Sequence, residues 1–232
     1  MLSAFKNLQI LGHMMLVRMT IGGDAQIFFS YLLQMVCLDF VDMDDIFDSV
    51  LQLTPKQPLA PNFNHLDYDS TYSIRNFGSL FMMFLIVPLS LLIAYPLKYI
   101  KHSKAAKIHV SLMNSLHWSG TINFLNESLL LFALCGMINT MALTWDNYGA
   151  AINSICAIIF LGISLYMMIF WASFYRINEN NLTGYKEKFR LKYANIYSEL
   201  NVLRHKEQAF NYMFLVASRK IVMSASLVYL QR

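Results

Sequence analysis

The chain has 232 residues, of which 56% are hydrophobic and 14% charged, and its formal net charge at pH 7 is +4. This composition is too apolar for a disordered chain and, with 9 Gly and 5 Pro, too poor in turn-forming residues for an all-β sandwich. It is typical of a helical membrane protein, so the expected fold class is all-α, a multi-pass transmembrane helix bundle.

The N-terminal part, residues 1–76, has the pattern of an extracellular or interfacial region with short helices and an acidic loop. Residues 25–38 are apolar but too short to span a membrane, which favours an interfacial helix or one that caps the helix bundle. The aspartates within residues 42–48 lack the glycine and terminal glutamate of an EF-hand. This favours a solvated acidic loop over a calcium site.

The remainder, residues 77–232, is predicted to be the membrane domain. Residues 77–97 carry no charge and lie between Arg75 and Lys98. At about 1.5 Å per residue they would cross the roughly 30 Å of a bilayer core, with a kink near Pro88. The basic stretch that follows predicts a cytoplasmic loop over residues 98–119. Its candidate contacts to anionic lipid headgroups are Lys98, Lys101, Lys104 and Lys107.

The second predicted span, residues 120–143, contains one formal charge, Glu127. Helical spacing places Asn123, Asn126 and Glu127 on one stripe. The stripe has two interpretations: a polar cavity or ion path, or hydrogen bonds that hold a helix bundle together.

Residues 148–175, the third predicted span, are also uncharged. The short connection 144–147 predicts that the second and third spans form an antiparallel hairpin. Ala150, Ser154 and Ala157 form a small-residue face suited to close helix contact. Aromatic belts are expected at both interfaces, with Trp145 and Tyr148 outside and Trp118 and Trp171 inside.

Residues 176–208 form a second basic, cytoplasmic loop, and the last apolar stretch, 210–230, is interrupted by Arg219 and Lys220. Either these charges lie in the middle of a span, or they flank a helix that begins at Ile221. An ion pair between Glu127 and either basic residue is geometrically plausible. The candidate intramembrane polar network therefore comprises Asn123, Asn126, Glu127, Asn139, Arg219 and Lys220.

Several stretches resemble the C-terminal membrane region of large, cysteine-rich ciliate surface proteins, whose furin-like or growth-factor-receptor-like repeats precede a multi-pass module. These are residues 24–33 (DAQIFFSYLL), 38–42 (LDFVD), 76–81 (NFGSLF) and 215–221 (LVASRKI). The resemblance covers most of the chain, which lacks the cysteine-rich part. It implies a fragment or a divergent short member of that family, with no catalytic residues.

No enzyme motif is present, and the three cysteines are widely spaced, so we expect no enzymatic activity, cofactor, metal site or disulfide framework. The expected partners are the lipid bilayer and, beyond it, other transmembrane subunits or a missing ectodomain, and not nucleic acid. We expect the plasma membrane, with residues 22–76 outside. The predicted function is the membrane-embedded module of a surface or receptor-like protein, and the alternative is a channel or transporter subunit.

Overall fold

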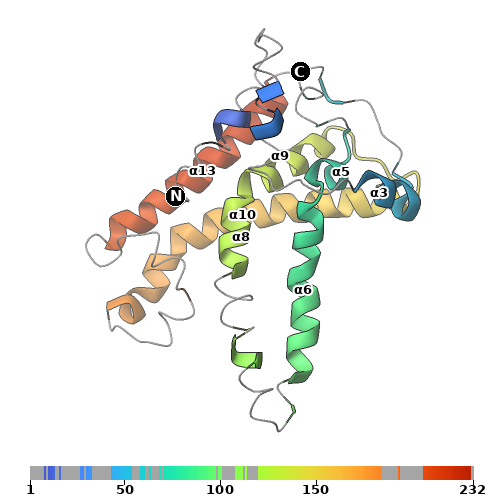
Figure 1. Ribbon diagram of the computed structural model, residues 1–232. Helices are drawn as coiled ribbons and strands as arrows, with labels where there is room; N and C mark the ends of the chain where they lie inside the picture. Colours follow the sequence, from blue (N-terminus) through green and yellow to red (C-terminus); the bar gives the residue numbers. More distant parts are fainter. Residues whose placement is uncertain are drawn as a thin grey trace. The chain divides into compact units, whose positions relative to one another are not determined.

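The computed structural model describes residues 8, 10–13, 16, 27, 28, 30–32, 43–53, 58–60, 63, 68, 70–97, 99, 100, 108–111, 113, 120–183, 193 and 206–230. Throughout these residues the regular elements are helices and there is no strand, which confirms the all-α class (Figure 1). The chain forms two compact units. The first unit comprises residues 1–81, 128–166 and 218–232, and the second comprises residues 82–127 and 167–217.

Helix α3 (Asp44–Leu51) occupies most of the acidic run. The prediction of a loop was therefore wrong for these residues. Met43 and Phe47 are four residues apart and both are buried, so the aspartates stand between apolar positions at helical spacing. Acidic residues in a first turn also favour a helix, because they face its partly positive end. Gln52 ends α3 in the left-handed conformation, with φ at 51°.

Helix α5 (Ser73–Phe77) precedes the first long apolar helix, α6 (Leu80–Leu97). Between them Gly78 has a positive φ of 53°, which glycine adopts without steric cost. The first apolar helix consequently begins at Leu80 and not at Phe77, and it continues through Pro88 as one helix.

The predicted second span is interrupted at Ser128. Helix α8 (Thr121–Glu127) ends before it and α9 (Leu129–Thr140) begins after it, so residues 120–143 form two helices and not one. Every residue of α9 from Leu129 to Asn139 is buried. A helix that is apolar and buried all round belongs in the centre of a core.

Helix α10 (Tyr148–Thr183) packs against α9 within the first unit. The rings of Phe132 and Phe160 lie 5.2 Å apart, and a Cβ on Gly136 would lie 3.1 Å from the carbonyl oxygen of Ala157. Moving forward along α9 thus means moving backward along α10, which confirms the antiparallel hairpin. Ala150, Ser154 and Ala157 are all buried, as expected of a packing face.

Helix α13 (Lys206–Tyr229) runs without a break through Arg219 and Lys220, which contradicts the interpretation of a helix beginning at Ile221. Its end belongs to the first unit, where the Ser224 hydroxyl donates to the Leu130 carbonyl at 3.2 Å. The hydroxyls of Thr140 and Tyr229 are also hydrogen-bonded, at 3.1 Å. Leu130 precedes Thr140 along α9, and their partners Ser224 and Tyr229 follow the same order along α13. This part of α13 therefore runs in the same direction as α9.

In the second unit, the ring of His109 binds the end of α6. Its Nδ1 lies 2.9 Å from the carbonyl oxygen of Ala94. Because a carbonyl only accepts, Nδ1 carries the hydrogen, and the bond satisfies one of the last carbonyls of the helix. Trp171 is buried beside Phe170 and Phe174, and its place in the inner aromatic belt stays a prediction.

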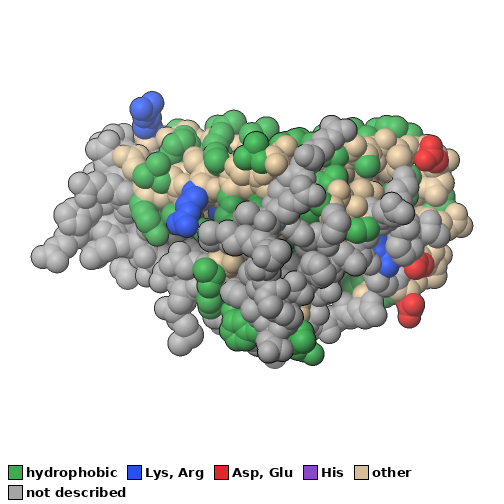
Figure 2. All heavy atoms as spheres, turned by 90° about the horizontal axis from the view of Figure 1, so that it is seen from above, with side chains coloured by type: hydrophobic (Ala, Val, Ile, Leu, Met, Phe, Trp, Pro, Cys, Tyr) green, Lys and Arg blue, Asp and Glu red, His purple; other side chains and the backbone are tan. Residues whose placement is uncertain are grey.

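Among the described residues, two helical segments are long and apolar enough to cross a membrane, Leu80–Leu97 and Tyr148–Phe174. The interrupted pair α8 and α9 would add a third if both helices belong to one span. Figure 2 shows hydrophobic side chains exposed among the described residues in view, and acidic side chains on the right. The chain is thus compatible with membrane insertion.

Candidate functional site

The most densely bonded polar region of the described structure surrounds residues 70–77, immediately before α6. Ser70, Thr71, Ser73 and Arg75 are buried although their side chains are polar. Buried polar groups need hydrogen-bond partners, since each unmet group costs free energy. The partners come from α3, α9 and α10.

Helix α9 binds this segment at two points. The Ser73 hydroxyl donates to the Cys135 carbonyl at 2.7 Å. The Asn139 side-chain amide donates to the Thr71 carbonyl at 3.0 Å. Asn139 stands near the end of α9 and is itself fully buried.

Helix α10 binds the same segment from another direction. The Asn153 side-chain oxygen accepts the backbone N–H of Ile74 at 3.0 Å. That N–H lies in the first turn of α5, where no helical partner exists, so Asn153 acts as a cap supplied by another helix. Within the segment, the Asn76 amide donates to the Ser70 carbonyl at 2.6 Å. The fold of residues 70–77 thus depends on side chains from two helices that follow it in sequence.

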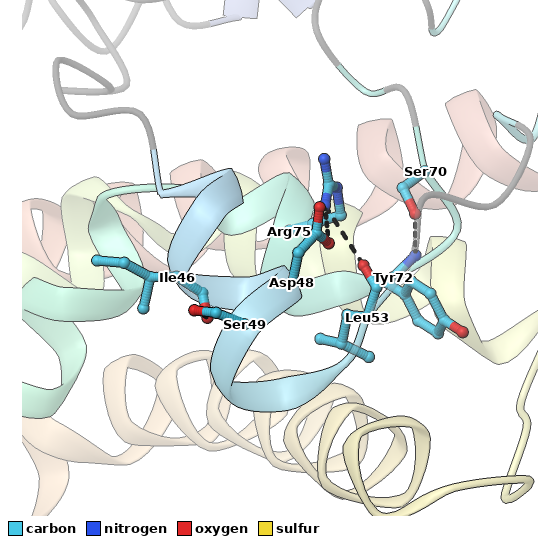
Figure 3. A network of polar contacts seen from close by, with 7 residues as sticks. All are labelled: Ile46, Asp48, Ser49, Leu53, Ser70, Tyr72 and Arg75. Carbon is cyan, nitrogen blue, oxygen red and sulfur yellow. Dashed lines mark hydrogen bonds and ion pairs between the residues drawn. The ribbon is translucent and has the colours of Figure 1, made fainter.

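Figure 3 shows the third attachment, an ion pair between α5 and α3. An Nη atom of Arg75 lies 2.8 Å from a carboxylate oxygen of Asp48 and donates to the Leu53 carbonyl at 3.3 Å. The Arg75 side chain is 4% exposed and that of Asp48 is 44% exposed. The sequence pattern treated Arg75 as a charge flanking a span, whereas the structure places it inside the first unit.

The end of α3 is held by the start of α10. The Tyr148 hydroxyl donates to the Val50 carbonyl. A Cβ on Gly149 would lie 1.7 Å from the Leu51 carbonyl oxygen, so only glycine permits this approach. The Ala150 N–H is capped by the side chain of Asn147 at 2.7 Å.

The apolar side of α5 inserts into the core between α9 and α10. The ring centroid of Phe77 lies 4.7 Å from that of Phe132 and 4.7 Å from that of Phe160. Such aromatic contacts add to the burial of their area. Residues 70–77 are therefore fixed by polar bonds and by a three-ring core, an arrangement we call the α5 clamp.

The α5 clamp retains four buried polar atoms without a hydrogen-bond partner in the described part of the chain: Thr71 Oγ1, Asn76 Oδ1, Asn139 Oδ1 and Asn153 Nδ2. No group of three His, Cys, Asp or Glu side chains suited to a metal ion occurs in the described ranges. The chemistry that the described clamp carries is hydrogen bonding and one ion pair.

The predicted polar network is divided between the two units. Asn139 and Lys220 are buried in the first unit, where Arg219 is exposed. In the second unit Asn126 is buried, and Asn123 and Glu127 are half-buried. The network as one site stays a prediction. The candidate headgroup contacts Lys98, Lys101, Lys104 and Lys107 lie outside the described residues.

Sequence reasoning missed Asp48, Ser73, Arg75 and Asn153. One signal was present: the run Ser70-Thr-Tyr-Ser-Ile-Arg-Asn76 is polar directly before an apolar helix, and Asn153 is an amide within an uncharged span. Polar residues in such places call for partners. Which partners they find is decided by the fold.

The chain matches no protein-family model, no curated protein and no solved structure.

Proposed function

We propose that the chain is a multi-pass integral membrane protein of the plasma membrane, and that it forms the membrane-embedded module of a surface or receptor-like protein. The observation that carries this proposal is the apolar exposed surface of α6 and α10. The exposed residues on α6 include Met82, Met83, Leu85, Ile86, Leu89, Leu92 and Ile93, and those on α10 include Ile152, Ile155, Ile158, Ile159, Leu165 and Ile169. Lipid is the solvent that accommodates such surfaces without cost.

The contacts within the first unit support the proposed topology. Residues 22–76 lie outside, α6 enters the cytoplasm, and α9 ends and α10 begins outside. Residues 98–119 and 176–208 are cytoplasmic, although the structure shows that the predicted loop 176–208 includes the end of α10 and the start of α13. In this topology the α5 clamp, the end of α9 and the start of α10 share one side of the membrane. The bond from Asn139 to Thr71 joins the end of α9 to the α5 clamp. The bond from Tyr148 to Val50 joins the start of α10 to α3, which this topology also places outside.

A receptor-like role is supported by the resemblance of the sequence to ciliate surface proteins and by the α5 clamp. The clamp ties the residues that enter the first long apolar helix to α9 and α10. An extracellular part attached before α5 would therefore be coupled to the helices through residues 70–77 and not through a free linker.

Glycosylation mapping in microsomes tests the topology. Two variants create acceptor sequons on opposite sides: Asn64→Thr makes an acceptor of Asn62 in the region proposed outside, and Tyr197→Thr makes one of Asn195 in the second loop. The Asn181→Gln background removes a natural sequon on the same side, Asn181-Leu-Thr183 at the end of α10. We expect a glycosidase-sensitive mobility shift for the first variant only, in protein that resists alkaline carbonate extraction. A shift for Tyr197→Thr alone would invert the topology, and release by carbonate would refute membrane insertion.

A channel or transporter subunit is the second candidate, and the interruption at Ser128 favours it. Transporters often place polar residues where a membrane helix is broken. Here Asn126 and Glu127 immediately precede the break between α8 and α9. Glu127→Gln is then expected to change ion or solute flux into proteoliposomes while the variant elutes normally from a sizing column. Unchanged flux in a protein that transports would contradict this candidate.

A further inference from the structure

Helix α3 presents apolar side chains on two sides. Phe47 is buried in a cluster with Leu53 and Ile74. Ile46 and Val50, four residues apart and so on one face of the helix, are 47% and 60% exposed. The exposed pair is not part of the buried cluster that α3 joins.

Val50 lies beside the start of an apolar stripe of α10. Tyr148, whose hydroxyl binds the Val50 carbonyl, is exposed, and so are Ile152, Ile155 and Ile159 along the same helix. These positions are separated by three or four residues and form one face. The stripe is part of the surface that the proposed function assigns to lipid. The hydrogen bond places Val50 at the N-terminal end of that stripe.

Side chains suited to the edge of a bilayer occur at the same end. Trp145 is exposed and lies less than one turn before Tyr148. Tryptophan and tyrosine prefer the boundary between headgroups and hydrocarbon, and short helices with an apolar face lie parallel to it. The charged and polar positions Asp45 and Ser49 are also exposed.

Helix α3 is fixed in this position. The Arg75–Asp48 ion pair holds one side of it, and the contact between Leu51 and Gly149 holds its end. Its exposed apolar residues therefore cannot turn away into a protein core without breaking the α5 clamp.

We propose that α3 is a membrane-surface element, whose residues Ile46 and Val50 lie in the interfacial layer of a phospholipid bilayer beside Trp145 and Tyr148. This inference rests on the proposed membrane insertion of α10. Its consequence is that α3 sets the depth at which α10 enters the bilayer.

Site-directed spin labelling of the full chain in phosphatidylcholine vesicles tests the proposal. Single labels are attached at Ile46→Cys and Val50→Cys, with Asp45→Cys and Ser49→Cys as matched controls on the same helix, in a background lacking Cys37, Cys135 and Cys156. A label at Ile155→Cys reports on α10. Collision with oxygen marks lipid, and collision with a water-soluble nickel chelate marks water.

The expected ratio of oxygen to nickel accessibility is several-fold higher at positions 46 and 50 than at 45 and 49, and highest at 155. Equal ratios at all four α3 positions, with a high ratio at 155, would overturn the inference and leave the membrane proposal intact. A low ratio at 155 would overturn both. Each labelled variant is first required to elute as the unlabelled protein does, so that misfolding is not read as exposure.

Discussion

Helices α6 and α9 are alike in composition and opposite in environment. Both are apolar and uncharged. Only 12% of the residues of α6 are buried, whereas eleven consecutive residues of α9 are buried. Hydropathy alone therefore does not separate a helix with an exposed apolar surface from one that forms a protein core.

The difference lies in a few small and polar residues. Gly136 lets α9 approach α10, and Asn139 binds the backbone of another segment. The single serine of α6, Ser90, bonds only to the Val87 carbonyl of its own helix at 2.7 Å. Residues that connect a helix to its neighbours, and not its mean hydropathy, identify the buried helix.

The largest expected contrast is between equivalent truncations of the two helices. Leu134 in α9 is fully buried and Leu89 in α6 is exposed. Leu134→Ala leaves a cavity and is expected to lower the free energy of unfolding by about 2 to 5 kcal/mol. Leu89→Ala is expected to cost less than about 0.5 kcal/mol. Denaturant titration in micelles measures both, and equal losses would contradict the contrast.

Two glycines of α10 repeat the contrast within one helix. A Cβ on Gly149 would collide with the Leu51 carbonyl, whereas Gly162 has no atom within 4 Å of that position. Gly149→Ala is expected to destabilise the protein by about 3 kcal/mol. Gly162→Ala should be neutral or stabilise by up to about 1 kcal/mol. Thermal unfolding, monitored by dye labelling of the buried Cys135, measures both changes in stability. An unchanged stability of Gly149→Ala would show that the end of α3 does not pack against α10.

The ion pair of the α5 clamp gives the next effect in size. Asp48→Asn removes the carboxylate that pairs with the buried Arg75 guanidinium and is expected to cost about 1 to 3 kcal/mol. Asp45→Asn, on the same helix and exposed, is the matched control and should change stability little. Limited proteolysis of residues 54–69 should then accelerate for the first variant only.

The smallest expected effect separates two serines. Ser73→Ala removes the bond from α5 to Cys135 and should cost about 1 kcal/mol. Ser90→Ala removes a bond internal to α6 and should have no measurable effect on the unfolding midpoint. Indistinguishable midpoints for the two variants would weaken the case for the α5 clamp.

The sequence predicted the helical class and much of the helix placement, because long uncharged segments have few alternatives. The segment expected at 77–97 begins at Leu80, and the one expected at 148–175 matches Tyr148–Phe174 closely. The antiparallel hairpin of α9 and α10 followed from a short connection. These features depend on local composition and chain length.

Features that depend on distant partners were not predicted. Arg75 looked like a flanking charge because its partner, Asp48, is 27 residues away on a helix taken for a loop. The break at Ser128 follows Asn126 and Glu127 directly and has no proline or glycine beside it, so no helix-breaking residue marks it. Asn153 caps α5 across 79 residues of sequence, a contact that no local pattern contains.

Tryptophan scanning of α6 and α9 tests the division into lipid-facing and core helices most directly. Each residue from Met82 to Ile93 and from Leu129 to Asn139 is replaced in turn, and the fraction of protein that is membrane-inserted and monodisperse after extraction is measured. A ring fits into lipid but not into a packed core. We expect this fraction to stay near that of the unmodified protein for tryptophan at most exposed α6 positions, and to fall sharply for tryptophan at nearly all α9 positions. An α9 that accepts tryptophan as readily as α6 would contradict the central role of α9 in the first unit.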